Sequence, residues 1–191
     1  MLKKILLTLC IVLGVCYPFV IYAGIKLDLI KYVLPIVAAV FLLRLVLSRR
    51  QHSEFKVLTC CSLITAAILC IGSAVFNNLK LVLFYPVFVN ALFFAIFFLS
   101  LYKGDAIITR FAKLTQKDGQ LPDFAISYTR KVTVVWSLFF IFNGLIALYT
   151  ALSNDIEVWT LYNGLISYIL IGCLMAIEFV IRIIIRKSHG S

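Results

Sequence analysis

Long apolar segments alternate with short polar stretches along this chain of 191 residues. An uncharged run of about 20 residues can cross the ~30 Å hydrocarbon layer of a membrane as one helix. The sequence therefore predicts an all-α fold, a polytopic transmembrane bundle of six helices in a single membrane domain, 1–191. The six predicted spans lie at about residues 5–23, 32–47, 57–76, 81–102, 132–152 and 158–177.

Two of these spans leave an alternative open. Residues 32–47 reach only ~24 Å as a helix, and Arg44 interrupts them, so Lys31 and Arg44 are expected to extend towards opposite membrane surfaces. Residues 5–23 also resemble a secretory signal peptide that ends near Ala23. An uncleaved first helix is the favoured interpretation, because the run is longer than the ~7–15 apolar residues of a typical signal.

The composition is typical of a membrane protein. Hydrophobic residues make up 63% of the chain and charged residues 14%, and the mean hydropathy is +1.08, whereas a soluble domain is about half apolar and a quarter charged. The formal net charge is +10, but the cations stand between apolar runs instead of clustering on one face, as they do in nucleic-acid-binding domains. Nucleic acid is therefore not an expected partner.

The positions of the cations predict the orientation in the membrane. Residues 103–131 form the only long polar passage, and they hold six of the eighteen Lys and Arg residues. If this loop and both termini are cytoplasmic, fifteen cations lie inside, and only Lys26, Lys31 and Lys80 lie outside. Cations beside membrane-spanning helices are retained on the cytoplasmic side, so we expect this threading, with the short turns after the third and fifth spans on the other side.

The basic loop is expected to contain an amphipathic helix at the membrane surface. The helix would run from Asp105, whose side chain can cap it, to about Lys117. Helical spacing places four apolar residues on one face: Ile107, Ile108, Phe111 and Leu114. Such a helix usually lies among anionic headgroups, and a docking surface for a cytosolic protein is the alternative. The candidates for either contact are Arg110, Lys113, Lys117, Arg130 and Lys131.

No group of residues has the spacing of a catalytic or metal-binding site. All six cysteines lie in apolar runs without a CxxC pair, and both histidines, His52 and His189, lie in polar flanks. We therefore expect no metal, disulfide or cofactor. Glu178 and Arg182 are one helical turn apart at the end of the sixth span, which favours an ordinary i,i+4 ion pair. The chain is accordingly expected not to be an enzyme.

Polar residues inside the spans are the remaining candidates for function. By helical rise, Asn90 and Asn143 lie ~13–16 Å from the ends of their spans, near the middle of the bilayer. An amide in hydrocarbon is costly unless it is hydrogen-bonded, so both should face the bundle interior, and we expect them to pair with each other. Together with Tyr162 and Asn163, they either join helices or line a substrate path, and the sequence leaves both open.

Parts of the second half of the chain resemble known families. Within residues 84–182, the segments FYPVFVNALFF, YTRKVT, NGLIA and LYNGLI resemble an uncharacterised family of small bacterial inner-membrane proteins. That family is often encoded beside fatty-acid-synthase-like and acyltransferase genes of the aryl-polyene type. The same half is more distantly similar to the intracellular septation protein A family, through Trp136, Phe140, Gly144, Trp159 and Gly164. The resemblance implies a Gram-negative inner membrane and an envelope or lipid-linked role, and it brings no catalytic residue.

Two functions are therefore expected. The first is a non-enzymatic inner-membrane component of envelope or acyl-lipid assembly, which contacts lipid headgroups or a cytosolic acyl-handling enzyme through its basic loop. The second is a small transporter or flippase, with an interior lined by asparagine and aromatic residues between the fourth, fifth and sixth spans.

Overall fold

The computed structural model describes residues 12, 14–47, 53–76, 78, 80–116, 119–153 and 155–189, and within these ranges the chain is helical and contains no strand. The helices, in chain order, are α2 (Tyr17–Lys26), α3 (Ile30–Leu47), α4 (Ser53–Val75), α5 (Lys80–Leu83), α6 (Tyr85–Ser100), α7 (Ile107–Leu114), α8 (Asp123–Leu152), α9 (Ile156–Leu161), the π-helical turn η2 (Tyr162–Ile166) and α10 (Ser167–His189).

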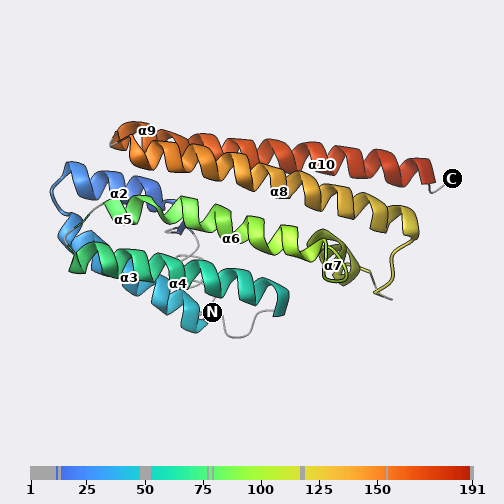
Figure 1. Ribbon diagram of the computed structural model, residues 1–191, viewed down its shortest axis with the longest axis horizontal. Helices are drawn as coiled ribbons and strands as arrows, with labels where there is room; N and C mark the ends of the chain where they lie inside the picture. Colours follow the sequence, from blue (N-terminus) through green and yellow to red (C-terminus); the bar gives the residue numbers. More distant parts are fainter. Residues whose placement is uncertain are drawn as a thin grey trace.

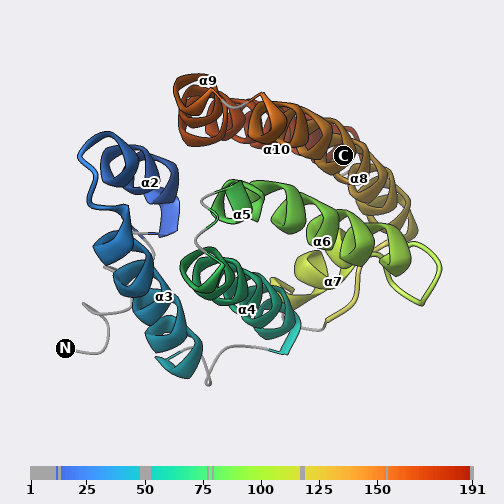
Figure 2. The same ribbon diagram turned by 60° about the vertical axis from the view of Figure 1, so that its left-hand side comes forward.

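The axes of the long helices are roughly aligned (Figure 1). One end of the bundle carries the turn between α2 and α3 together with α5 and α9, and the opposite end carries α7 and the end of α10. The closest packing is between α6 and α8 and between α3 and α4, and α7 lies against α8 and α6. The turned view shows α6 between α4 and the pair formed by α8 and α10 (Figure 2).

Three helical stretches are long and apolar enough to cross a membrane: Lys80–Ser100, Asp123–Leu152 and Ile156–Ser188. They correspond to the last three predicted spans. α3 and α4 contain shorter apolar stretches, Ile30–Leu43 and Cys60–Val75, and much of the predicted span at 5–23 lies outside the described residues. Among the described residues, the protein is thus all-helical with three helices of membrane-spanning length.

Two helices extend further than the hydropathy pattern predicts. α8 begins at Asp123 instead of residue 132, and α10 continues to His189 instead of ending at residue 177. The predicted loop at 103–131 is therefore too long at its end. Charged residues such as Arg and Lys are good helix formers, so the loss of hydropathy does not end a helix. The start of α8 is instead set by Pro122, whose backbone is extended at φ −65° and ψ 154°.

α7 lies where the amphipathic helix was predicted, but its ends differ from the prediction. The expected cap by Asp105 is wrong: Ala106 is the N-cap residue and makes no side-chain cap, and the N–H of Ile107 donates to Ser100 Oγ at 2.9 Å. The Asp105 carboxylate instead pairs with Lys113 Nζ at 2.6 Å, which takes it away from the helix terminus. The helix ends at Leu114, and Lys117 lies outside the described residues.

The apolar face of α7 packs partly against the protein. Ile107 is buried together with Phe97 of α6 and Phe140 of α8, and Ile108 and Phe111 pack against the same cluster. The Phe97 and Phe140 rings meet edge to face, with centroids 5.1 Å apart, a favourable aromatic geometry. This cluster holds α7 against α6 and α8.

A break between α5 and α6 provides hydrogen-bond acceptors for two other helices. Pro86 has no N–H, so the carbonyl four residues earlier, that of Val82, lacks its helical donor. The Tyr17 hydroxyl donates to this oxygen at 2.6 Å. Trp159 Nε1 donates to the neighbouring carbonyl of Leu83 at 2.9 Å. Backbone groups inside a membrane need such partners, and here α2 and α9 supply them.

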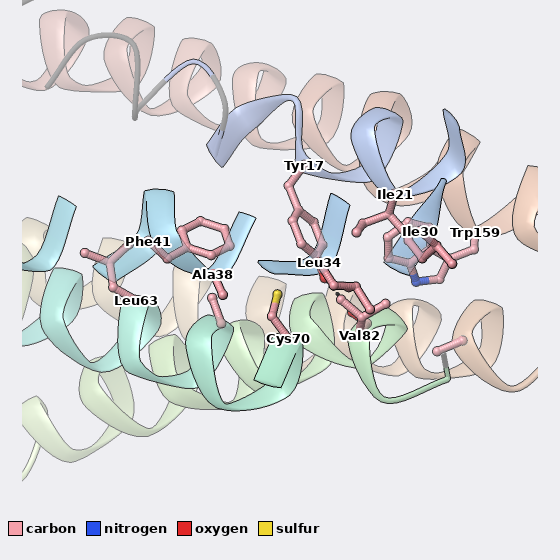
Figure 3. Close-up of a cluster of buried hydrophobic side chains, with 12 residues drawn as sticks. Tyr17, Ile21, Ile30, Leu34, Ala38, Phe41, Leu63, Cys70, Val82 and Trp159 are labelled. Atoms are coloured by element: carbon pink, nitrogen blue, oxygen red, sulfur yellow. Dashed lines mark hydrogen bonds between the residues drawn. The ribbon is translucent and has the colours of Figure 1, made fainter. Parts of the chain in front are cut away.

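The same two aromatic residues belong to the larger buried cluster of the protein (Figure 3). Tyr17 and Trp159 are 2% and 0% exposed, and side chains from α3 and α4, such as Phe41 and Leu63, complete the cluster. The bundle is therefore closely packed at the end that carries α5 and α9.

An ion pair joins α2 to α9 at this end. Lys26 Nζ lies 2.7 Å from a Glu157 carboxylate oxygen, and both side chains are exposed. The hydrogen bond and the charge of Glu157 raise the pKa of Lys26 above its ordinary value. The start of α9 is fixed by Asp155, whose side chain accepts from the N–H groups of Glu157 and Val158, as an N-cap residue does.

Candidate functional site: a cavity between α6, α8 and α10

The two asparagines that the sequence placed at mid-membrane depth meet inside the bundle. Asn143 Nδ2 on α8 donates to Asn90 Oδ1 on α6 at 3.0 Å, which confirms the predicted pair. The bonding is not reciprocal. Asn90 Nδ2 donates to the Pro86 carbonyl at 2.8 Å, and Asn143 Oδ1 accepts from the Tyr162 hydroxyl at 2.8 Å. The result is a chain of three hydrogen bonds that joins α6, α8 and the π-helical turn.

Asn163, the fourth interior residue predicted from the sequence, bonds in a different direction. Its Nδ2 donates to Thr150 Oγ1 at 3.2 Å and to the Trp159 carbonyl at 2.9 Å. The Trp159 carbonyl also accepts from the backbone N–H of Tyr162. The bond to Thr150 means that Asn163 ties the turn to α8.

The two glycines that follow these asparagines mark close helix contacts. A Cβ on Gly144 would lie 3.1 Å from Asn90 Cβ, and a Cβ on Gly164 would lie 3.0 Å from two ring atoms of Phe19 on α2. Gly144 therefore allows the close approach at which Asn143 bonds to Asn90, and Gly164 allows the close approach of α2. Small residues have this role in membrane helix packing, where no hydrophobic force draws helices together.

A cavity of about 840 Å³ extends from this polar cluster along the bundle. On α8 its lining residues recur at helical spacing from Phe124 to Asn143, and on the last helix they run from Asn163 to Arg186. At 1.5 Å per residue, these stretches span about 28 Å and about 34 Å. A volume of this size is typical of a small-molecule site, and the cavity is long and narrow.

The closed end of the cavity is polar but internally satisfied. Asn90, Asn143 and Asn163 line it together with Tyr17 and Tyr85. Among the described residues, every buried side-chain nitrogen and oxygen has a hydrogen-bond partner. No group at this end therefore requires a polar ligand.

The middle of the cavity is apolar. Aromatic rings of α6 and α8 form one wall, with Phe93 and Phe140 stacked at 5.1 Å between centroids. Ile171 and Met175 of α10 lie on the other wall. This stretch can accommodate hydrocarbon but offers few hydrogen-bonding groups.

Charged residues line the cavity only at its other end, within the part of the chain that the structure describes: Glu178, Arg182 and Arg186 of α10. Glu178 and Arg182 form the predicted i,i+4 pair at 3.2 Å. Tyr128 of α8 donates to the Glu178 carbonyl at 3.1 Å and lies 3.4 Å from its carboxylate. Arg186 is exposed and makes no hydrogen bond or ion pair to another described residue.

Three of the cations predicted to contact headgroups bond to residues 101–105 of the protein itself. Arg110 donates to the backbone carbonyls of Asp105 and Lys103 at 2.8 and 3.1 Å. These bonds hold the start of the loop close to α7. Arg130 donates to the carbonyl of Leu101 at 2.8 Å, beyond the last turn of α6, where a cation is favoured by the helix dipole. Lys113 is paired with Asp105, as described above, and Lys131 is exposed. Their contact with lipid stays a prediction.

No three His, Cys, Asp or Glu residues lie close enough to hold a metal ion within the described ranges. The residues that sequence reasoning missed are those of the cavity wall, above all Tyr128 and Arg186. A signal for the wall was present in the sequence, because six residues of α10 recur at spacings of three and four: Tyr168, Ile171, Met175, Glu178, Arg182 and Ile185.

Comparisons with protein-family models, with curated proteins and with solved structures give no match for this chain.

Proposed function

We propose that this protein is a membrane protein that binds a lipid-like, amphipathic molecule in the cavity between α6, α8 and α10, as a small transporter or flippase would. The observation that supports the proposal is the cavity itself, which has a volume of about 840 Å³, an apolar middle and charged residues at one end only. An amphipathic molecule has this same distribution of polar and apolar groups. A component that acts only as a scaffold needs no such interior space, so the cavity favours the transporter over the scaffold.

The proposal includes a bacterial inner-membrane location with six spans and both termini in the cytoplasm. Lys26, Lys31 and Lys80, the three cations assigned to the outer side, lie at the ends of α2, α3 and α5 that share one end of the bundle (Figure 1). Arg182 and Arg186 lie towards the opposite end, near the end of α10. The positive-inside rule then makes the charged end of the cavity cytoplasmic.

The proposed partners at that surface are anionic lipid headgroups and cytosolic acyl-handling enzymes. α7 would lie at the interface with Leu114, which is 57% exposed, towards the membrane, while Ile107 holds the helix on the bundle. The ligand would then enter from the inner leaflet at the end of the cavity lined by Arg182 and Arg186.

The test is to fill the cavity and measure retained lipid. Met175 lines the cavity at mid-length, whereas its neighbour Ala176 does not line it. We expect Met175→Trp to lose a lipid that copurifies with the wild-type protein and with the matched control Ala176→Trp, as counted by native mass spectrometry. Equal retention by all three proteins, or no retained lipid in any, would contradict the proposal.

A further inference from the structure

We infer that the ligand of this cavity is an amphiphile with an anionic head group, whose head lies at Arg182 and Arg186 and whose apolar part extends towards Asn143. The inference rests on the proposed function and narrows its ligand to one chemical class. It follows from the placement of charge along the cavity and from the hydrogen bonding at its closed end.

The charges at the mouth select an anionic head group. Glu178 is already engaged, because it pairs with Arg182 at 3.2 Å and accepts from Tyr128. The guanidinium of Arg182 also lies over the Phe179 ring, 5.7 Å from its centroid, which fixes its position. Arg186, one turn further along, has no partner among the described residues. The lining charges sum to one positive charge, and a guanidinium matches a carboxylate or phosphate with two parallel hydrogen bonds.

The closed end determines the direction in which the ligand lies. The amides of Asn90 and Asn143 are bonded to each other, to Pro86 and to Tyr162. Every buried side-chain donor that the structure describes there already has a protein partner. An apolar chain end can therefore displace water from this position without leaving a donor unpaired. A charged head group placed there would be desolvated near the middle of the bilayer without a countercharge, which is costly. The head consequently belongs at the mouth and the tail at the asparagines.

The experiment is a displacement measurement with competitors of matched chain length. The full-length protein, in a steroid-based detergent without an alkyl chain, is loaded with the fluorescent fatty acid cis-parinaric acid. We expect palmitate or hexadecyl phosphate to displace the probe, and these two arms distinguish a carboxylate head from a phosphate head. Hexadecyltrimethylammonium, with the opposite charge, should displace it at least tenfold less effectively.

Three single variants test the assigned position of the head group. Arg186→Gln is the clean variant, because it breaks no contact to another described residue, and we expect it to weaken probe binding about tenfold, as loss of a charged hydrogen bond does. Arg182→Gln should weaken binding at least as much, because it also leaves Glu178 unpaired at the mouth. Lys187→Gln removes a neighbouring cation that does not line the cavity, and it should bind the probe like the wild-type protein.

The outcomes separate this inference from the proposed function. Unchanged affinity in Arg186→Gln, or equal displacement by the cationic competitor, would overturn the inference. If the wild-type protein still retained a lipid that Met175→Trp lost, the cavity would remain a lipid site with a different ligand. If the probe did not bind and no lipid were retained, both the inference and the proposed function would fail.

Discussion

Asn143 on α8 donates its amide N–H to the amide oxygen of Asn90 on α6, with 3.0 Å between the two heavy atoms. Both side chains are buried, at 6% and 7% exposure, and they lie at the closed end of the cavity. A glycine directly after Asn143 lets the two helices approach at this depth. The pair therefore fixes the spacing of the two helices that form one wall of the site.

Disruption of this pair should reveal coupling between the two residues. We expect Asn90→Leu and Asn143→Leu each to lower the free energy of unfolding by about 0.6–1.7 kcal/mol, the range of interhelical hydrogen bonds in membranes. The double variant should cost less than the sum, because the second change removes a bond already lost. Unfolding in mixed micelles measures all three. As a control, Asn163→Leu should add its cost to that of Asn90→Leu, since Asn163 bonds to Thr150 instead; strict additivity within the Asn90–Asn143 pair would refute direct coupling.

Three glycines should respond differently to the same added methyl group. Gly144→Ala should destabilise by about 1–3 kcal/mol, because its Cβ meets the Cβ of Asn90 at 3.1 Å and overpacking has a cost of this size. Gly164→Ala should cost less, since the ring of the half-exposed Phe19 can move. Gly172→Ala meets nothing within 4 Å and should be neutral or stabilise by up to about 1 kcal/mol through helix propensity. A Gly172→Ala variant as unstable as Gly144→Ala would contradict the observed packing.

The contribution of the Tyr17 hydroxyl to the free energy of unfolding should depend on the helix break at Pro86. Tyr17→Phe removes the donor to the Val82 carbonyl, and we expect a loss of about 1 kcal/mol in unfolding free energy. Pro86→Ala restores a backbone N–H four residues after Val82, which can serve the same oxygen. In that background the cost of Tyr17→Phe should shrink. An undiminished cost, measured by the same mixed-micelle unfolding, would show that the hydroxyl does not compensate for the proline.

The proposed threading can be read directly with reporter fusions. Fusions after His52 and Gly119 should report a cytoplasmic position, because the basic loops are retained inside. Fusions after Asn78 and Asp155 should report a periplasmic position, in line with the bundle end that carries α5 and α9 (Figure 1). A periplasmic reading at Gly119 would reverse the orientation and place the mouth of the cavity on the outer side.

The sequence predicted the depth of polar residues better than their partners. Helical rise alone placed Asn90 and Asn143 at one level, and few other polar groups at that depth were available to them. It did not predict the bond from Tyr162, because that bond depends on the π-helical turn, which hydropathy does not register. The ion pair between Asp105 and Lys113 was not predicted for a similar reason. An aspartate just before a helix can either cap the helix or form an ion pair, and only the packing of α7 decides between the two.

The sequence raised an interior lined by asparagine and aromatic residues between the fourth, fifth and sixth spans as one of two alternatives, but it did not predict which residues of α10 line the cavity. The hydropathy of α10 does not show whether the helical face that carries Met175 contacts α8 or is separated from it by a cavity. The charged residues at the end of that face were the better indication. Glu178 is on the same helical face as Tyr168 and Ile171, so a face that continues from interior to charged was visible in the spacing, and Tyr128 marks where α8 meets it.

The π-helical turn at Tyr162–Ile166 sets the rotational phase of the helix that follows it. Such a turn holds one more residue than an α-helical turn, and one residue corresponds to about 100° around the axis. Uninterrupted α-helical winding would put Glu178 about 100° away from Trp159, whereas the added residue brings the two onto the same side. One residue of register therefore allows a single membrane-length helix to seal one end of the bundle with an indole and to present its charges to the cavity at the other.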